Sequence, residues 1–213
     1  MGNTVGSLTQ FQQSVIQGLL LGDGYLRQIP GRKNAFLEIN HSFQQRAYVD
    51  WKYSILESIS GGKPKARKGN NERVAYRFYT RQMPEMTELN HLWYKNRGKH
   101  APKDFKLDPV MLAVWFMDDG SLCGKVDAYL NTQQFDSMSQ KILLNSLLKL
   151  GLHARLNRDK QYYRIRFLKE SLPRLVEIIE PYVIPSMRYK LGYDPVETTR
   201  RSPVPHKGHR VKI

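Results

Sequence analysis

Cysteine is almost absent from this 213-residue sequence, in which Cys123 has no second thiol to pair with. A single cysteine excludes an internal disulfide and a zinc finger, and it is typical of a reducing compartment. The six histidines do not recur at the spacing of a metal-binding motif. The composition therefore excludes a disulfide scaffold and gives no support to a zinc protein or to a histidine-based nuclease.

Long hydrophobic runs and acidic residues are also scarce. The apolar runs at 18–22 and 110–117 are far shorter than the roughly 20 residues that span a bilayer, and the N-terminus shows no secretion-signal pattern. Lys and Arg number 34 against 19 Asp and Glu, which gives a formal net charge of +15. This excess favours a polyanionic partner, with nucleic acid ahead of an anionic membrane.

Two apolar stretches end in the same dipeptide. "LLLGDG" places Asp23 before Gly24, and "VWFMDDG" places Asp119 before Gly120. One Asp-Gly pair is a common turn, but two in matching contexts indicate a repeated unit. If the two helices pack side by side, Asp23 and Asp119 meet where both carboxylates and the helix C-termini repel one another. Because carboxylate and carbonyl oxygens are the ligands that Mg²⁺ prefers, the pattern predicts a magnesium site.

The hydrophobic periodicity repeats along the chain as helix, two strands, helix, two strands, helix. In the first half these elements are expected at residues 11–21, 24–29, 35–41, 45–58, 63–68, 73–81 and 84–94. In the second half they are expected at 109–117, 121–123, 127–133, 139–150, 153–157, 162–168 and 170–179. We therefore predict an α+β fold of two pseudo-symmetric αββαββα halves, each with an antiparallel sheet, joined at a two-helix interface. The predicted boundaries are 8–95 and 109–192 for the repeats, 96–108 for a linker, and 193–213 for a basic, flexible tail.

Basic residues alternate with apolar ones in the predicted strands. In "RVAYRFYTR" and "YYRIRFL" the arginines share one face, and Val, Ile and aromatic residues share the other. A solvated sheet face accounts for one such strand, but basic faces in both halves form a cationic surface that suits a nucleic-acid duplex. Arg, Asn and Gln are the side chains that read bases in the major groove. The candidate DNA-binding residues are Arg27, Asn40, Lys63, Lys65, Arg67, Arg73, Arg77, Arg81, Asn131, Gln133, Arg155, Asn157, Arg164 and Arg166.

The two motifs resemble those of the LAGLIDADG homing endonucleases of the single-chain, two-motif type that introns encode. "IQGLLLGDG", residues 16–24, and "LAVWFMDDG", residues 112–120, each fall on the nine-letter motif. The resemblance extends to "LNTQQF" and "IPSMRYKL", and it covers about residues 8–192. It implies a monomer whose two sheets form a saddle on double-stranded DNA and whose two active sites cut the target site-specifically. It also implies an intracellular location, in a mitochondrion or chloroplast of a eukaryote or in a bacterial cytoplasm.

The resemblance assigns the site residues. Asp23 and Asp119 would be the catalytic metal ligands, and Gly22 and Asp118 would offer backbone carbonyls to the metals. Lys99 and Lys190 match the lysines that lie beside each active site in this family, although a lysine in so basic a chain also suits phosphate or solvent. Mg²⁺ is the expected cofactor, with Mn²⁺ as a substitute and Ca²⁺ binding without supporting cleavage.

One departure from the motif concerns the interface. Val114 and Asp118 occupy positions at which the family usually has small residues, so the two-helix interface is expected to be asymmetric. Two alternatives to the nuclease remain open. The same scaffold can serve as an RNA maturase that assists splicing of its host intron, or as a catalytically inactive DNA-binding protein. Retention of both Asp-Gly pairs argues against the inactive protein, because repelling carboxylates weaken the binding of a polyanion.

Overall fold

The computed structural model describes residues 4–5, 8–69, 73–95, 98–123 and 127–192. The predicted tail at 193–213 therefore lies outside the described residues. After the short strands β1 (Thr4–Val5) and β2 (Leu8–Thr9), the first half contains α1 (Gln10–Leu21), β3 (Tyr25–Arg27), β4 (Phe36–Ser42), α2 (Arg46–Leu56), β5 (Lys65–Lys68), β6 (Val74–Tyr79) and α3 (Pro84–Trp93). The second half contains α4 (Pro109–Asp119), β9 (Gly120–Cys123), β10 (Asp127–Leu130), α5 (Ser137–Lys149), β11 (Ala154–Asp159), β12 (Tyr162–Phe167) and α6 (Leu172–Ile179). The predicted αββαββα order is thus confirmed in both halves.

The two four-stranded sheets have the same topology. Their strand orders are β3-β4-β6-β5 and β9-β10-β12-β11, and every neighbouring pair is antiparallel. In both, the first two strands lie together and the fourth strand lies between the second and the third. This shared order is the structural form of the repeat that the sequence predicts.

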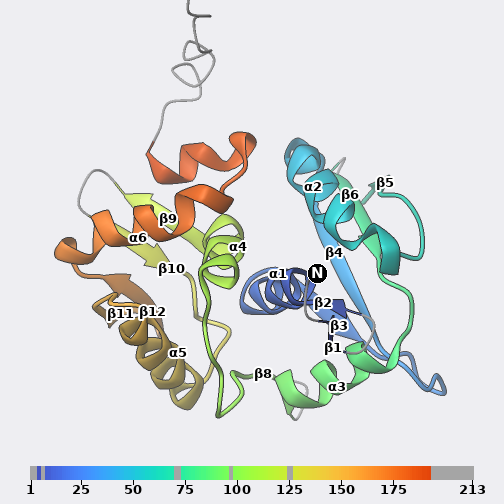
Figure 1. Cartoon of the computed structure of the whole chain (residues 1–213), viewed down its shortest axis with the longest axis horizontal. Coiled ribbons are helices and arrows are strands. Elements are labelled where there is room, and N and C mark those ends of the chain that lie inside the picture. The colour runs from blue at the N-terminus through green and yellow to red at the C-terminus, as the bar shows by residue number, and fades with distance from the viewer. Residues whose placement is uncertain (1–3, 6–7, 70–72, 96–97, 124–126, 193–213) are drawn as a thin grey trace, which may run out of the picture.

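Helices α1 and α4 lie side by side at the centre of the molecule, with one half on either side of them (Figure 1). Both are buried along most of their length: Ile16 and Leu19 of α1 and Leu112 and Trp115 of α4 are fully buried. A helix that is buried on most sides belongs to a core. The pair therefore forms the shared core between the halves.

Local side chains fix where these helices begin. Thr9 and Gln12 form a capping box on α1, in which each side chain accepts from the other residue's backbone N–H at 3.2 and 3.0 Å. Asp108 caps α4 by accepting from the Met111 N–H at 2.8 Å, and Pro109 occupies the first turn. The second Asp108 oxygen accepts from the Ser14 hydroxyl at 2.6 Å. The cap of α4 is thereby bonded directly to α1.

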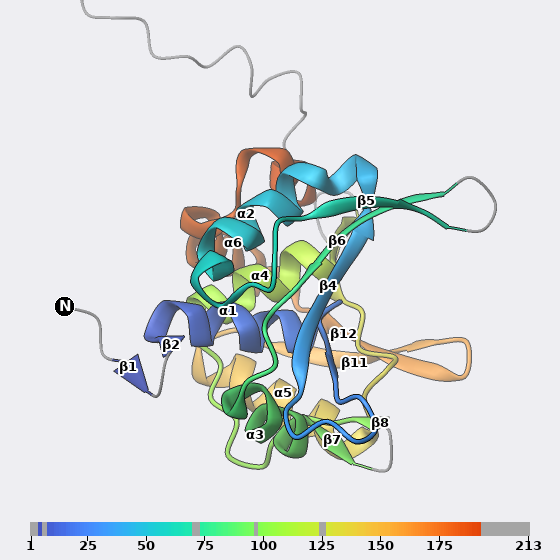
Figure 2. The same cartoon turned by 90° about the vertical axis from the view of Figure 1, so that its right-hand side faces the viewer.

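The β5–β6 and β11–β12 hairpins extend from the central helices toward the same side of the molecule (Figure 2). Inward-facing residues of the sheets, such as Leu37 and Ile39 of β4 and Ile165 and Phe167 of β12, are buried. Their neighbours along each strand face outward, on the side away from the core. Among the described residues, no helix is long and apolar enough to cross a membrane.

Candidate functional site

The two motif aspartates lie where α1 and α4 end. Asp119 is the last residue of α4, and Asp23 follows Gly22, which caps α1. The N–H of Gly24 donates to the Leu19 carbonyl at 2.8 Å, and the N–H of Gly120 donates to the Phe116 carbonyl. A Cβ would lie 2.8 Å from the Leu19 carbonyl oxygen at Gly24, and 2.4 Å from the Phe116 carbonyl oxygen at Gly120. Glycine follows each aspartate because the chain turns tightly against the last turn of its own helix.

The charge of Asp23 acts on the ionisation of Asp119. Burial, followed by the charges of Asp23 and Asp118, raises the pKa of Asp119 to about 7. Burial and the charge of Asp118 raise the pKa of Asp23 as well. Both shifts show that ionised carboxylates are unfavourable here without a cation. The hard oxygen donors of Asp23 and Asp119 therefore fit Mg²⁺ or Mn²⁺.

Each motif also receives one lysine. Lys99 Nζ donates to the carbonyl oxygens of Gly22 at 2.9 Å and Gly24 at 3.0 Å, and Lys190 Nζ donates to the Asp118 carbonyl at 2.8 Å. Gly22 and Asp118 occupy the same position in their motifs, so the two lysines make equivalent contacts. Burial lowers the pKa of Lys99 to about 8, and it lowers the pKa of Lys190 too.

These contacts refine two sequence predictions. The carbonyls of Gly22 and Asp118, predicted as metal ligands, accept hydrogen bonds from lysines in this structure. The predicted linker 96–108 contains a strand, β8 (Gly98–Lys99), that pairs with β7 (Tyr94–Lys95). The pairing of Tyr94 with Lys99 positions the lysine beside the first motif. Lys190 lies on the 3₁₀ helix Pro185–Leu191.

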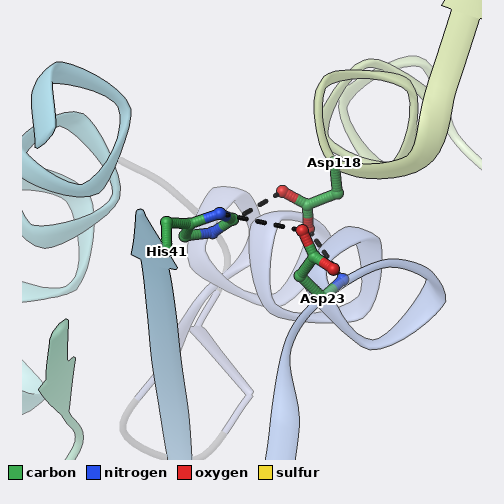
Figure 3. Close-up of side chains that lie close together, drawn as sticks. All are labelled: Asp23, His41 and Asp118. Atoms are coloured by element: carbon green, nitrogen blue, oxygen red, sulfur yellow. Dashed lines mark hydrogen bonds and ion pairs between the residues drawn. The ribbon is translucent and has the colours of Figure 1, made fainter. Parts of the chain in front are cut away.

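The Asp118 side chain has a different environment from that of Asp119. It is fully buried, and it points toward Asp23 and His41 (Figure 3). One oxygen, Oδ2, accepts from the Asp23 backbone N–H at 3.2 Å, and the other, Oδ1, accepts from Lys52 Nζ at 2.7 Å. Burial is the largest single influence and favours the protonated acid, but Lys52, through its charge and its hydrogen bond, acts together with His41 and Tyr48 to hold the pKa of Asp118 below its ordinary value. Asp118 is therefore an ionised partner of Lys52.

Ligand atoms of Asp23, His41 and Asp118 lie within 4.8 Å of one another, as they would around a metal ion. However, Lys52 Nζ already lies 2.7 Å from both Asp118 Oδ1 and His41 Nε2. The ammonium group supplies the positive charge that this cluster needs. The metal hypothesis consequently stays with Asp23 and Asp119.

Sequence reasoning missed His41, Lys52 and Tyr48. A usable signal exists in α2, whose buried residues Tyr48, Val49, Lys52 and Leu56 form one helical face. A lysine on an otherwise apolar face requires a buried anion. The pairing of that lysine with Asp118 depends on the packing of α2 against the other half, which no local pattern encodes.

The outward sheet faces carry most of the predicted DNA-binding residues. In the first half Lys65 lies opposite Arg77, and Arg77 lies opposite Asn40, so these three side chains form a row across the strands. In the second half Arg155 lies opposite Arg166, and Asn157 lies opposite Arg164. Arg67 of β5 and Arg27 of β3 complete the set on strands.

Five predicted contacts lie outside the strands, because β5, β6 and β10 are shorter than expected: Lys63, Arg73, Arg81, Asn131 and Gln133. Arg81 Nη2 donates to the Ser58 carbonyl at 2.7 Å, and Gln133 donates to Asp159 Oδ2 at 2.9 Å. The prediction that these five residues lie within strands is wrong, because β5 begins at Lys65, β6 runs from Val74 to Tyr79 and β10 ends at Leu130.

Two second-half arginines are held by neighbours within the sheet. Arg166 forms an ion pair with Asp127, and its Nε donates to Asp127 Oδ1 at 3.0 Å. The Arg164 guanidinium lies 4.0 Å from the centre of the Tyr129 ring. Such contacts fix long side chains before a ligand arrives, which reduces the entropy lost on binding.

Comparison with known proteins gives the class to which this arrangement belongs. The sequence matches the LAGLIDADG DNA endonuclease family over residues 13–175, and the chain therefore belongs to that family. It is 29% identical over 215 residues to the cytochrome b mRNA maturase bI2 of Saccharomyces cerevisiae, covering 90% of this chain and 50% of the maturase. The chain thus spans half the length of that relative. It is 26% identical to the probable intron-encoded endonuclease 1 of Wickerhamomyces canadensis, covering 88% of this chain and 87% of the relative.

Solved structures show the same fold. The homing endonuclease I-WcaI bound to its DNA recognition sequence superposes with a TM-score of 0.79 at 24% identity, over 88% of each chain. A complex of I-DmoI with nicked target DNA in the presence of Mn superposes with a TM-score of 0.55 at 13% identity, covering 82% of this chain and 98% of that one. At these identities the likeness concerns the fold.

Proposed function

We propose that this chain is a site-specific homing endonuclease that makes a double-strand break in a long DNA target by metal-dependent phosphodiester hydrolysis. The observation that carries the proposal is the repeated pair of an aspartate and a lysine at the two central helix ends. Asp23 lies beside Lys99, which donates to the neighbouring carbonyls, and Asp119 follows Asp118, whose carbonyl accepts from Lys190. Two equivalent sites in one chain match the two strands of a duplex, so we propose a monomer.

Each group in the site has a proposed task. Asp23 and Asp119 would hold Mg²⁺, which when bound supplies charge neutralisation at phosphorus and a more acidic water. Lys99 and Lys190 would keep the two helix ends in place and add positive charge beside the phosphate, through charge-assisted hydrogen bonds. The outward arginines, lysines and asparagines of both sheets would bind phosphates and base edges along the target.

The experiment uses the intron-less allele of the gene that carries this reading frame, because a homing target spans the insertion site. Purified protein should cut this duplex in Mg²⁺ or Mn²⁺, and EDTA should abolish cutting. Ca²⁺ should support binding without cleavage, because its larger and more flexible coordination shell does not hold an attacking water in line. An allele that already carries the insertion is the matched control, and it should stay intact. Failure to cut the intron-less allele in both Mg²⁺ and Mn²⁺ would contradict the proposal.

A maturase function is the second candidate, because two relatives at 29% identity are named cytochrome b mRNA maturases. Host intron RNA would then be the partner of the basic surface. Splicing assistance would use that surface rather than the metals, so it should survive the replacement of Asp23 by Asn. Protein that promotes splicing of its intron but leaves the intron-less allele uncut would establish the maturase in place of the nuclease.

A further inference from the structure

Lys52 carries a charge into the boundary between the two halves. Its side chain is fully buried, as is that of Asp118, its ion-pair partner at 2.7 Å. Lys52 belongs to α2 of the first half, whereas Asp118 belongs to α4 of the second. The Lys52 ammonium also lies 3.9 Å from the centre of the Tyr48 ring, and the Tyr48 hydroxyl donates to the Val114 carbonyl at 3.3 Å. Two contacts from one face of α2 thus bind α4.

His41 provides a third contact to the Lys52 ammonium, besides Asp118 and the Tyr48 ring. His41 Nδ1 lies 3.1 Å from Gln45 Oε1, which can only accept, so Nδ1 carries the ring proton and Nε2 is an acceptor. That acceptor lies 2.7 Å from Lys52 Nζ. The position of Lys52 is therefore defined by the Asp118 carboxylate, the His41 imidazole and the Tyr48 ring together.

The network ends on the backbone of the first motif. Asp118 Oδ2 accepts from the Asp23 N–H at 3.2 Å while Oδ1 is bound to Lys52. The Asp118 carboxylate can turn only by giving up one of these bonds. The orientation of the Asp23 peptide, and hence of its side chain, is consequently tied to Lys52.

The second motif has no matching arrangement among the described residues. Gly22 occupies the position equivalent to Asp118 and offers no side chain to the Asp119 peptide. Near the end of β10, the counterpart of β4, the buried polar residue is Thr132, whereas near the end of β4 it is His41. In the described part of the chain, Thr132 is hydrogen-bonded only within the second half. Gln140 donates to the Thr132 carbonyl at 3.0 Å and to the Tyr163 carbonyl at 2.8 Å. The network therefore serves one motif of the two.

We infer that Lys52 is a positioning residue which acts through Asp118 to orient Asp23, and that it controls cleavage of one DNA strand more than the other. This inference rests on the proposed endonuclease function. Lys52 itself is fully buried, so this role requires no contact with the DNA. Its effect comes from geometry at the first motif, where small displacements of a reacting group are costly.

The test measures single-turnover cleavage of each strand separately, on duplexes labelled at one end or the other. Lys52→Met should slow one strand by roughly tenfold or more, as expected for a misplaced reacting group, and the other by less than about threefold. The affected strand should be the one that Lys99→Met slows, because Lys99 binds the first motif as well. Leu147→Ala, which truncates a fully buried residue of α5 away from the site, is the matched control for lost stability and should slow both strands alike.

A double variant separates positioning from charge balance. Thermal unfolding of the metal-free protein should show that Lys52→Met lowers the midpoint, because Asp118 is left buried without its partner. Lys52→Met combined with Asp118→Asn should recover most of the lost unfolding temperature, while cleavage of the same strand stays slow. If the single variant does not fold, strand cleavage is measured on this double variant instead. Equal slowing of both strands by these variants, or full recovery of both rates in the double variant, would overturn the inference. If the unaltered protein does not cut the target at all, the proposed function is overturned, and the strand-specific role of Lys52 with it.

Discussion

Gly22 faces Asp118 across the two-helix interface, although the two residues hold the same position in their motifs. A Cβ on Gly22 would lie 2.4 Å from the Asp118 Cβ. One turn earlier, Gly18 faces Val114 in the same manner, with 2.7 Å between a hypothetical Cβ and the Val114 Cβ. The absence of small residues from α4 at these positions is thus offset by glycines of α1. The asymmetry that the sequence predicts takes the form of a small residue opposite a larger one.

Gly18→Ala should destabilise the protein by about 1–3 kcal/mol, the usual cost of overpacking a core. Chemical denaturation of the metal-free protein measures this change. Val114→Gly in the same chain removes the Cβ that the new methyl group meets, and it should recover only part of the loss, because the Met111 carbonyl oxygen, 2.8 Å from the added Cβ, remains in place. Gly61→Ala is the matched control, since its added Cβ meets its nearest atom at 3.5 Å. An unchanged stability for Gly18→Ala would contradict the close approach of the helices.

Asp23→Asn and Asp119→Asn should each abolish double-strand cleavage in Mg²⁺ and leave specific DNA binding largely intact. Each replacement would remove a proposed anionic metal ligand and would also relieve repulsion with phosphate. Cleavage assays and band shifts on the same duplex measure the two effects. Full double-strand cleavage by either variant would remove that aspartate from the proposed site.

Lys99→Met should slow cleavage by about tenfold or more, because the Gly22 and Gly24 carbonyls lose their shared donor and the site loses a charge. Single-turnover rates at saturating protein report this loss separately from binding. Lys103→Met replaces an exposed lysine of the same segment and should leave the rate within about twofold. Equal rates for the two variants would mean that Lys99 acts as an ordinary surface lysine.

Arg77→Ala and Arg81→Ala should differ in their effect on DNA binding. Arg77 lies in the row with Lys65 and Asn40, whereas the Arg81 guanidinium is bonded to the Ser58 carbonyl. Loss of a phosphate contact should reduce the slope of log affinity against log salt by about 0.9. If Arg77 reads a base instead, its loss should cost about 1–3 kcal/mol at one base pair. We expect one of these changes for Arg77 and neither for Arg81, and the reverse result would contradict the assignment of the outward face.

His41 should stay neutral until the solution is strongly acidic. Burial and the charge of Lys52 lower the pKa of His41 to about 4 from its ordinary value of 6.5. Between these values the unfolded chain binds the proton and the folded protein does not, so the free energy of unfolding falls as the pH decreases from 6.5 to 4. The contribution amounts to about 3 kcal/mol at most. Denaturation across this range should show a shallower decline for His41→Gln, and equal slopes for both proteins would contradict the shift.

Sequence reasoning succeeded where the signal is local and repeated. The apolar helices, the Asp-Gly ends and the alternating strands all follow from periodicity and turn chemistry, and both αββαββα halves form as predicted. The ends of the strands were harder to predict, because Arg81 and Gln133 continue a basic or polar pattern beyond the last paired residue. Lys52 and His41 could not be placed, because their partner Asp118 comes from the other half, and such pairing depends on how α2 packs against α4.

The unequal contacts between α1 and α4 make each half complementary to the other and not to itself. Two copies of the first half would set glycine against glycine, leaving a void and depriving each Lys52 of its anion. Two copies of the second half would place Val114 against Val114, which overpacks the interface, and Asp118 against Asp118, where the two carboxylates repel. Pairing identical halves therefore does not give an exactly symmetric version of this interface. On the proposed DNA target, such a chain would have one fixed direction, with a different half at each end.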